Sequence, residues 1–229
     1  MCINLQIRFL EVPIMLYFVV FIIGFLISGI WLAFGLLLDR ILKTYKTQMF
    51  KPLLSALIPT IVIWLLIGDH PFHLERLNDW RVWVIAAVTT VVTVAIELMT
   101  PQDDCSNTKR NWKADFLVNG IDGACMEIPQ RAMMQAFILW LLTKWHLNPV
   151  FCILITALIW CAGILFQAFV IVKKPAIKQL IIELAASFVF SIGIGYVFYT
   201  TSCVLLPMAA HASERILQVL NDYRKQKKH

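Results

Sequence analysis

Residues 12–38 read VPIMLYFVVFIIGFLISGIWLAFGLLL, an apolar run of 27 residues without a charge. A helix needs about 20 such residues to cross the hydrocarbon core of a bilayer. The run is also longer than the roughly 7 to 15 apolar residues of a secretory signal peptide, and no small-residue cleavage pattern follows it. It therefore predicts a membrane-spanning helix rather than a cleaved signal.

The composition of the whole chain agrees with a membrane environment. Of the 229 residues, 60% are hydrophobic and 15% are charged, whereas a soluble domain carries about a quarter charged residues to cover its surface. This composition excludes an ordinary soluble domain. It predicts one integral membrane domain over residues 1–229, with the lipid bilayer of the cell membrane as its surroundings.

The net charge of +6 does not indicate nucleic acid as a partner, because the basic residues lie in short clusters between apolar runs. The sequence also lacks a Gly-rich phosphate loop and a nucleotide motif, so no cofactor is expected. Four cysteines lie inside apolar stretches without a Cys-x-x-Cys pair. They are expected to be buried thiols: Cys125, Cys152, Cys161 and Cys203.

Further apolar runs predict an all-α polytopic protein with about seven transmembrane helices. The runs cover residues 52–68, 82–99, 116–143, 149–172 and 180–220. The last run spans about 61 Å as a helix, which is two crossings, with a break expected near residues 200–202. Asp122, which lies between two glycines, is expected to cap or break the fourth helix. The sequence leaves open whether residues 1–11 add an eighth, interfacial helix.

Loops that stay in the cytoplasm collect Lys and Arg, and this rule orients the chain. Fourteen basic residues fall on one side of the predicted membrane, at 40, 43, 46, 51, 109, 110, 113, 173, 174, 178, 224, 225, 227 and 228. The other side holds four, at 8, 76, 81 and 144. This asymmetry predicts that the N-terminus is outside and the C-terminus inside.

Two predicted spans carry ionisable residues at membrane depth, where charges are costly unless paired or wetted. At 1.5 Å per residue, Arg131 and Glu127 lie about 17 and 23 Å from the outer end, and His211, Glu214 and Arg215 about 15 to 21 Å. We therefore expect one cluster, in which Glu127 has Arg131 as its i, i+4 partner on the same face, with Glu127 also near Arg215 and Arg131 near Glu214 or His211. It is either a structural lock between helices or a functional pocket.

The remaining polar residues give weaker signals. His70 and His73, with Asp69 and Glu75, could hold a metal ion, but a solvated loop is the expected role and no metal site is predicted. Glu97 and Glu183 fall at cytoplasmic span ends, where a carboxylate can reach the interface at low cost.

Residues 126–131 and 207–215 resemble motifs of the CPBP or Abi family, which is related to the CAAX prenyl endopeptidases. The first motif of that family is Glu-Glu-x-x-x-Arg, and this chain has Met126-Glu127-Ile-Pro-Gln-Arg131. The third motif is His-x-x-x-Asn after a Gly-rich span and a proline, and here it is His211-Ala-Ser-Glu-Arg215. The resemblance covers residues 116–220 as core helices, with 12–115 as peripheral spans.

The second motif of the family, Phe-x-x-x-His, resembles Phe166-Gln167-Ala-Phe-Val170. The resemblance implies that the first Glu and this His would activate water, and that the last His and Asn would stabilise an oxyanion. The matching catalytic positions are Glu127, Arg131, His211 and Arg215. The binding positions are Met126, Gln167, Val170 and Glu214.

Two of these positions cannot accept a proton, because they hold Met126 and Val170. The leading hypothesis is therefore a pseudoprotease of this family that binds a peptide or a membrane partner, as in bacteriocin self-immunity or scaffolding. The alternative is an active intramembrane endopeptidase that uses Glu127 and His211. A transporter, whose buried charges line a path, is a third hypothesis that the lack of an inverted repeat disfavours.

Overall fold

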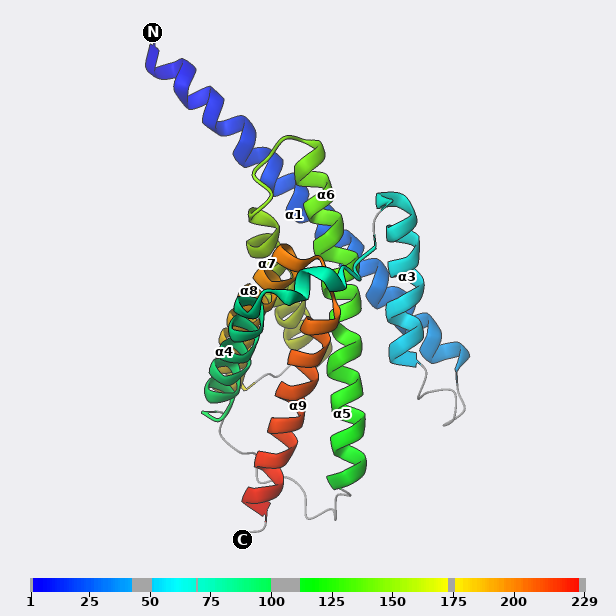
Figure 1. The fold of residues 1–229 in the computed structure, drawn as a ribbon. Coiled ribbons are helices and arrows are strands. Elements are labelled where there is room, and N and C mark those ends of the chain that lie inside the picture. The colour runs from blue at the N-terminus through cyan, green and yellow to red at the C-terminus, as the bar shows by residue number, and fades with distance from the viewer. Residues whose placement is uncertain (1, 43–50, 69, 100–111, 173–175, 227–229) are drawn as a thin grey trace.

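The computed structural model describes residues 2–42, 51–68, 70–99, 112–172 and 176–226, and these form a helical bundle (Figure 1). Its segments are α1 (Cys2–Ile41), α3 (Lys51–Ile67), η1 (Leu74–Asn78), α4 (Trp80–Glu97), α5 (Trp112–Glu127), η2 (Ile128–Gln135), α6 (Ala136–Lys144), α7 (Phe151–Phe166), η3 (Gln167–Val172), α8 (Ile177–Thr201) and α9 (Leu205–Gln226). The described residues include no β-strand. The predicted all-α fold is confirmed.

The helices follow the predicted apolar runs. Because α5, η2 and α6 continue one another, and η3 continues α7, the described residues form seven long helical segments. Four are long and apolar enough to cross a membrane, at Ile14–Leu38, Trp80–Glu97, Phe151–Val170 and Ile177–Thr201, and Leu53–Ile67 is shorter. The chain is therefore a membrane protein with at least these candidate spans. Residues 2–11 continue α1 and form no separate helix.

Several predicted cytoplasmic residues, at 43, 46, 109, 110, 173, 174, 227 and 228, lie outside the described residues, as does Asp69. The expectation that Asp122 caps or breaks a helix is wrong, because α5 runs unbroken to Glu127. The glycines beside it have another role. A Cβ atom on Gly123 would lie 3.0 Å from the carbonyl oxygen of His211, so the glycine lets α9 approach α5 closely.

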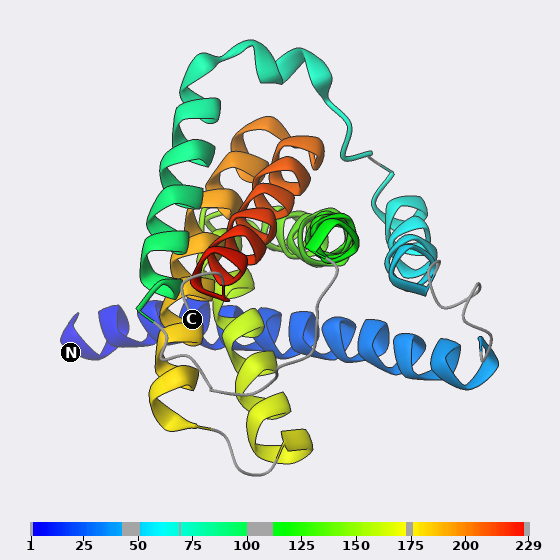
Figure 2. The same cartoon turned by 90° about the horizontal axis from the view of Figure 1, so that it is seen from below.

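The packing places α9 beside α5 and α8 between α4 and α7 (Figures 1 and 2). Helix α1 crosses one side of the bundle and contacts α3, α7 and η2. A buried apolar cluster joins α1, α6 and α7 through Val20, Ile138, Leu142 and Ile159. This core holds the long α5–η2–α6 segment in the middle of the bundle.

The break between the last two helices falls where the sequence predicts it. Helix α8 ends at Thr201, and Ser202 has φ 49°, in the left-handed region that stops a helix. The backbone N–H of Val204 donates to the Pro71 carbonyl at 2.9 Å. This bond ties the turn between α8 and α9 to the segment before η1.

The middle of the long segment, η2, is π-helical. Its second residue is Pro129, which has no N–H and crowds the carbonyl four residues before it. The Ala136 N–H donates to the Arg131 carbonyl, five residues back, as in a π-bulge, a feature that is frequent at functional sites. Every residue of η2 is buried. The sequence predicts a helix over residues 116–143, and the π-helical turns are a feature that it does not predict.

Candidate functional site

Glu127 is the last residue of α5, and its side chain is 0% exposed. The Arg131 Nε donates to its Oε2 at 3.0 Å. The His211 Nδ1 lies 2.8 Å from its Oε1. Because an ionised carboxylate can only accept hydrogen bonds, Nδ1 carries the hydrogen. Each oxygen of Glu127 is thus engaged by a basic side chain, one on its own segment and one on α9.

The second carboxyl of the cluster, Glu214, lies on α9 and is 2% exposed. Its Oε2 lies 3.5 Å from both His211 Nε2 and Arg215 Nε. The Gln218 amide donates to its other oxygen. Glu127, Arg131, His211, Glu214 and Arg215 therefore form one continuous chain of contacts between the two segments.

The pairings inside this cluster match the predicted ones in part. Glu127 pairs with Arg131, as predicted, and with His211 rather than Arg215, and Glu214 pairs with Arg215 rather than Arg131. The physical reason is local reach, because residues four apart on a helix face each other. Arg131 meets Glu127 within its own segment, and this leaves Arg215 for its neighbour Glu214.

Arg131 also holds two neutral side chains that the sequence analysis missed. Its Nη1 donates to Gln135 Oε1 at 3.0 Å, and its Nη2 donates to Ser191 Oγ at 3.2 Å. Gln135 in turn donates to the Gly195 carbonyl at 2.8 Å, so the guanidinium ties η2 to α8. The available signal was spacing, since Gln135 lies four residues after Arg131 in an apolar run.

Glu97 is a further member of the cluster. The sequence predicts that it reaches the interface, but its Oε2 is buried, with no hydrogen-bond donor among the described residues. Its carboxyl group lies against that of Glu214. Helix α4 thereby joins the cluster. Glu183, in contrast, is exposed on α8.

The residues matched to the second motif lie elsewhere. Gln167 and Val170 are on η3, where both are exposed, Val170 by 52%. Met126 is half-buried on α5 beside Glu127. The structure thus brings together the five charged residues, and it leaves Gln167 and Val170 on the outer surface.

The loop between α3 and α4 holds His70 and His73, whose rings stack with centroids 4.7 Å apart. The His73 Nδ1 lies 3.0 Å from Glu75 Oε1. Within the described ranges, no group of three or more His, Cys, Asp or Glu side chains is arranged to hold a metal ion.

Residues 112–216 match a family model, that of the type II CAAX prenyl endopeptidase Rce1-like proteins. The predicted resemblance to the CAAX endopeptidase relatives is therefore confirmed for this segment, which runs from α5 into α9. No curated protein and no solved structure matches the chain.

Proposed function

We propose that this chain, whose residues 112–216 are Rce1-like, is a catalytically degenerate multi-pass protein of the cell membrane that binds a peptide or a partner membrane protein. Self-immunity to a bacteriocin and scaffolding are the roles that such binding would serve. One observation carries the proposal. The only carboxylate of the first motif is fully buried, and both of its oxygens are engaged by basic side chains.

Peptide hydrolysis needs a group that takes a proton from the attacking water, and such general-base action contributes about 10²- to 10⁴-fold in rate. Glu127 is a poor candidate because Arg131 holds it as an ion pair. The family positions that would activate water carry a thioether and an isopropyl group, at Met126 and Val170. The cluster is better suited to locking α5 and η2 against α9.

A second candidate function is an endopeptidase that uses Glu127 and His211. The observation that favours it is their 2.8 Å contact, since a histidine oriented by a carboxylate is a common general base. The two proposals differ in one measurable outcome, which is whether the purified protein cleaves a peptide.

We expect the purified protein to release no product from a prenylated CAAX peptide or from an unmodified apolar peptide. The reason is the missing proton acceptor, and the measurement is chromatography of the peptide after long incubation in lipid nanodiscs. We also expect no activity from Met126→Glu combined with Val170→His, because residue 170 is exposed on η3. Cleavage by the wild-type protein that Glu127→Gln abolishes, with folding intact, would establish the endopeptidase instead.

We also propose that the N-terminus is outside and the C-terminus inside, as the basic residues predict. In Figure 1 the end of α4, the start of α5, the start of α8 and the end of α9 all lie at the lower end of the bundle. These ends adjoin the predicted cytoplasmic loops. Lys144, at the end of α6, lies at the opposite end of the long segment.

Labelling of single cysteines in a cysteine-free background tests this orientation. An impermeant maleimide added to intact cells should label His73→Cys and Lys144→Cys but not Lys178→Cys or Arg224→Cys, nor cysteines at 46 and 174, which lie outside the described residues. Permeabilised cells provide the control, since all positions should then react. Labelling of cysteines at 178 and 224 in intact cells, with the cysteine at 73 protected, would show that the topology is the inverse of the proposed one.

A further inference from the structure

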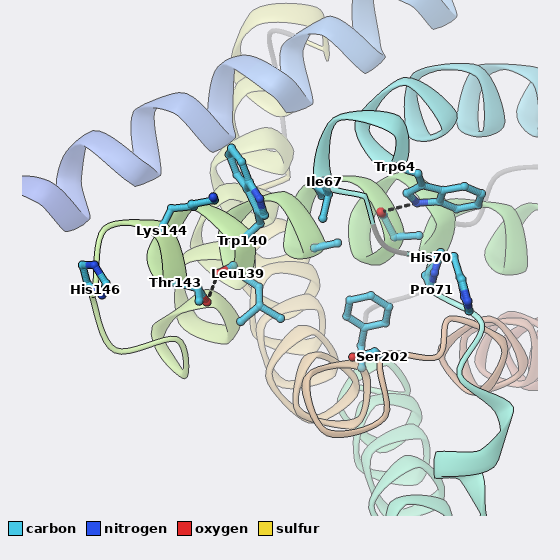
Figure 3. Close-up of a pocket in the computed structure, with 13 residues that line it drawn as sticks. Trp64, Ile67, His70, Pro71, Leu139, Trp140, Thr143, Lys144, His146 and Ser202 are labelled. Carbon is cyan, nitrogen blue, oxygen red and sulfur yellow. Dashed lines mark hydrogen bonds between the residues drawn. The ribbon is translucent and has the colours of Figure 1, made fainter.

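A cavity of about 640 Å³ lies at the end of the bundle where α6 and α8 finish, between α3, α6 and α8 (Figure 3). Its size is within the range of small-molecule sites, about 300 to 1,000 Å³. None of the five clustered charged residues lines it. It is therefore a separate feature from the candidate site around Glu127.

The walls of this cavity are apolar and aromatic. In Figure 3, Trp64 and His70 lie on one side and Trp140 and Lys144 on the other, with Ser202 below. The Trp64 Nε1 donates to the Ala132 carbonyl at 2.9 Å, and its ring meets Phe72 edge to face at 5.5 Å. These contacts hold the indole in place, so the wall is preformed.

The rim is cationic. Lys144 is exposed, and its Nζ lies 5.9 Å from the ring centroid of Trp140. Ser202, which lines the cavity, accepts a hydrogen bond from Arg76 Nη1 at 3.1 Å. Among the described residues, which do not include Asp69, no Asp or Glu lines the cavity. The acid next to Arg76, Glu75, pairs with His73. Lys144 in the lining and Arg76, which is bound to Ser202 of the lining, would attract an anionic group to the mouth.

Three polar groups of the lining already have hydrogen-bond partners. The Trp64 N–H donates to the Ala132 carbonyl, the Thr143 hydroxyl donates to the Leu139 carbonyl at 2.8 Å, and the Ser202 hydroxyl accepts from Arg76. These groups are engaged, and a bound peptide whose own N–H and C=O groups stayed without partners would be costly to bury. A hydrocarbon chain has no such groups.

The position of the cavity also favours a lipid. Helices α6 and α8 end beside it, at Lys144 and Thr201, and tryptophan beside a helix end is typical of the membrane interface. The outer face of α3 next to it is apolar and exposed, with Leu65 80% and Leu66 59% accessible. In a membrane, lipid chains would lie against this face of α3, next to the cavity.

We propose that this cavity binds an anionic phospholipid, with an acyl chain along Trp64, Trp140 and Phe198 and the phosphate headgroup between Lys144 and Arg76. The site does not depend on the proposed function, because it uses none of the residues of the Glu127 cluster. Basic residues near a membrane surface contribute about 1 kcal/mol each to binding of acidic lipid. This corresponds to about a five-fold change in affinity per residue.

Native mass spectrometry of the delipidated full-length protein, titrated with phosphatidylglycerol or phosphatidylcholine, tests this. We expect one tightly retained phosphatidylglycerol and at least five-fold weaker retention of phosphatidylcholine. Lys144→Gln and Arg76→Gln should each weaken phosphatidylglycerol binding about five-fold. Ala136→Phe, which fills the cavity, should abolish the retained adduct. Lys178→Gln, an exposed lysine at the other end of α8, is the matched control and should change nothing.

Circular dichroism of each variant separates loss of binding from loss of fold. Equal retention of the two lipids, or unchanged binding in both Lys144→Gln and Arg76→Gln, would overturn the proposal. Glycerol phosphate that binds as tightly as the lipid would show that a free phosphate compound is the ligand. An acidic apolar peptide that displaces phosphatidylglycerol one for one at lower concentration would assign the cavity to peptides and would equally overturn it.

Discussion

Replacing Arg131 with alanine should lower the free energy of unfolding by about 3 kcal/mol or more, the scale for breaking a buried ion pair. The guanidinium is fully buried and donates to Glu127, Gln135 and Ser191. Its removal leaves a buried carboxylate with His211 as its remaining basic partner. The measurement is denaturant unfolding in mixed micelles, together with the yield of monodisperse protein.

Two further variants test the reason for this loss. Arg131→Lys should recover only part of the stability, because one ammonium group cannot reproduce the planar fork that reaches three partners. The double variant Glu127→Gln with Arg131→Met should be more stable than Arg131→Ala, because no buried charge is left alone. Arg81→Ala, at an exposed arginine, is the control and should stay within about 0.5 kcal/mol of wild type. An Arg131→Ala protein as stable as wild type would show that the cluster does not hold the helices together.

Replacing Gly193 with alanine should also destabilise the bundle, by about 1 to 3 kcal/mol or more, because it overpacks the contact between α8 and α4. A Cβ atom there would clash with Thr89 Oγ1 and would lie 2.6 Å from its Cγ2 and 2.9 Å from its Cβ. Threonine is stiff at χ1 and cannot turn both branches away. Thermal unfolding of the purified protein measures the effect.

Gly163 provides a matched control on α7, because a Cβ atom added there meets nothing within 4 Å. Gly163→Ala should therefore keep or raise the stability, since alanine favours helix over glycine. Thr89→Ala should relieve much of the loss in Gly193→Ala, because it removes two of the three close atoms. If Gly193→Ala unfolds at the same temperature as Gly163→Ala, the close approach of α4 and α8 is wrong.

The apolar runs of the sequence predict the positions of the helices well because the bilayer allows few backbone structures. A backbone in hydrocarbon must satisfy its own hydrogen bonds, so a long apolar run folds as a helix. The run 149–172 corresponds to α7 and η3, and the predicted break at 200–202 falls at Ser202. Depth along a helix follows equally from the constant rise per residue. This is why the charges of the two predicted spans could be expected at overlapping depths.

The rotation of each helix about its own axis does not follow from the sequence in the same way. Whether Val170 faces the cluster or the lipid depends on how α7 and η3 pack, and the structure turns this residue outward. The π-helical turns of η2 shift the register after Pro129, and this shift sets which of its polar side chains meet α8. A plain 3.6-residue period cannot anticipate either result.

Apolar length and the spacing of charges thus predicted a helical membrane protein and similar depths for its buried charges, and the motifs at 126–131 and 207–215 carried the resemblance to the CAAX endopeptidase relatives. The full set of partners of each charge, the contact of Glu97 with Glu214 and the cavity beside Trp64 and Trp140 came from the tertiary structure. The physical reason is that hydrogen bonds and close packing act over about 3 to 4 Å. At that scale the rotation and approach of neighbouring helices decide which groups meet, and residues far apart in the chain jointly set both.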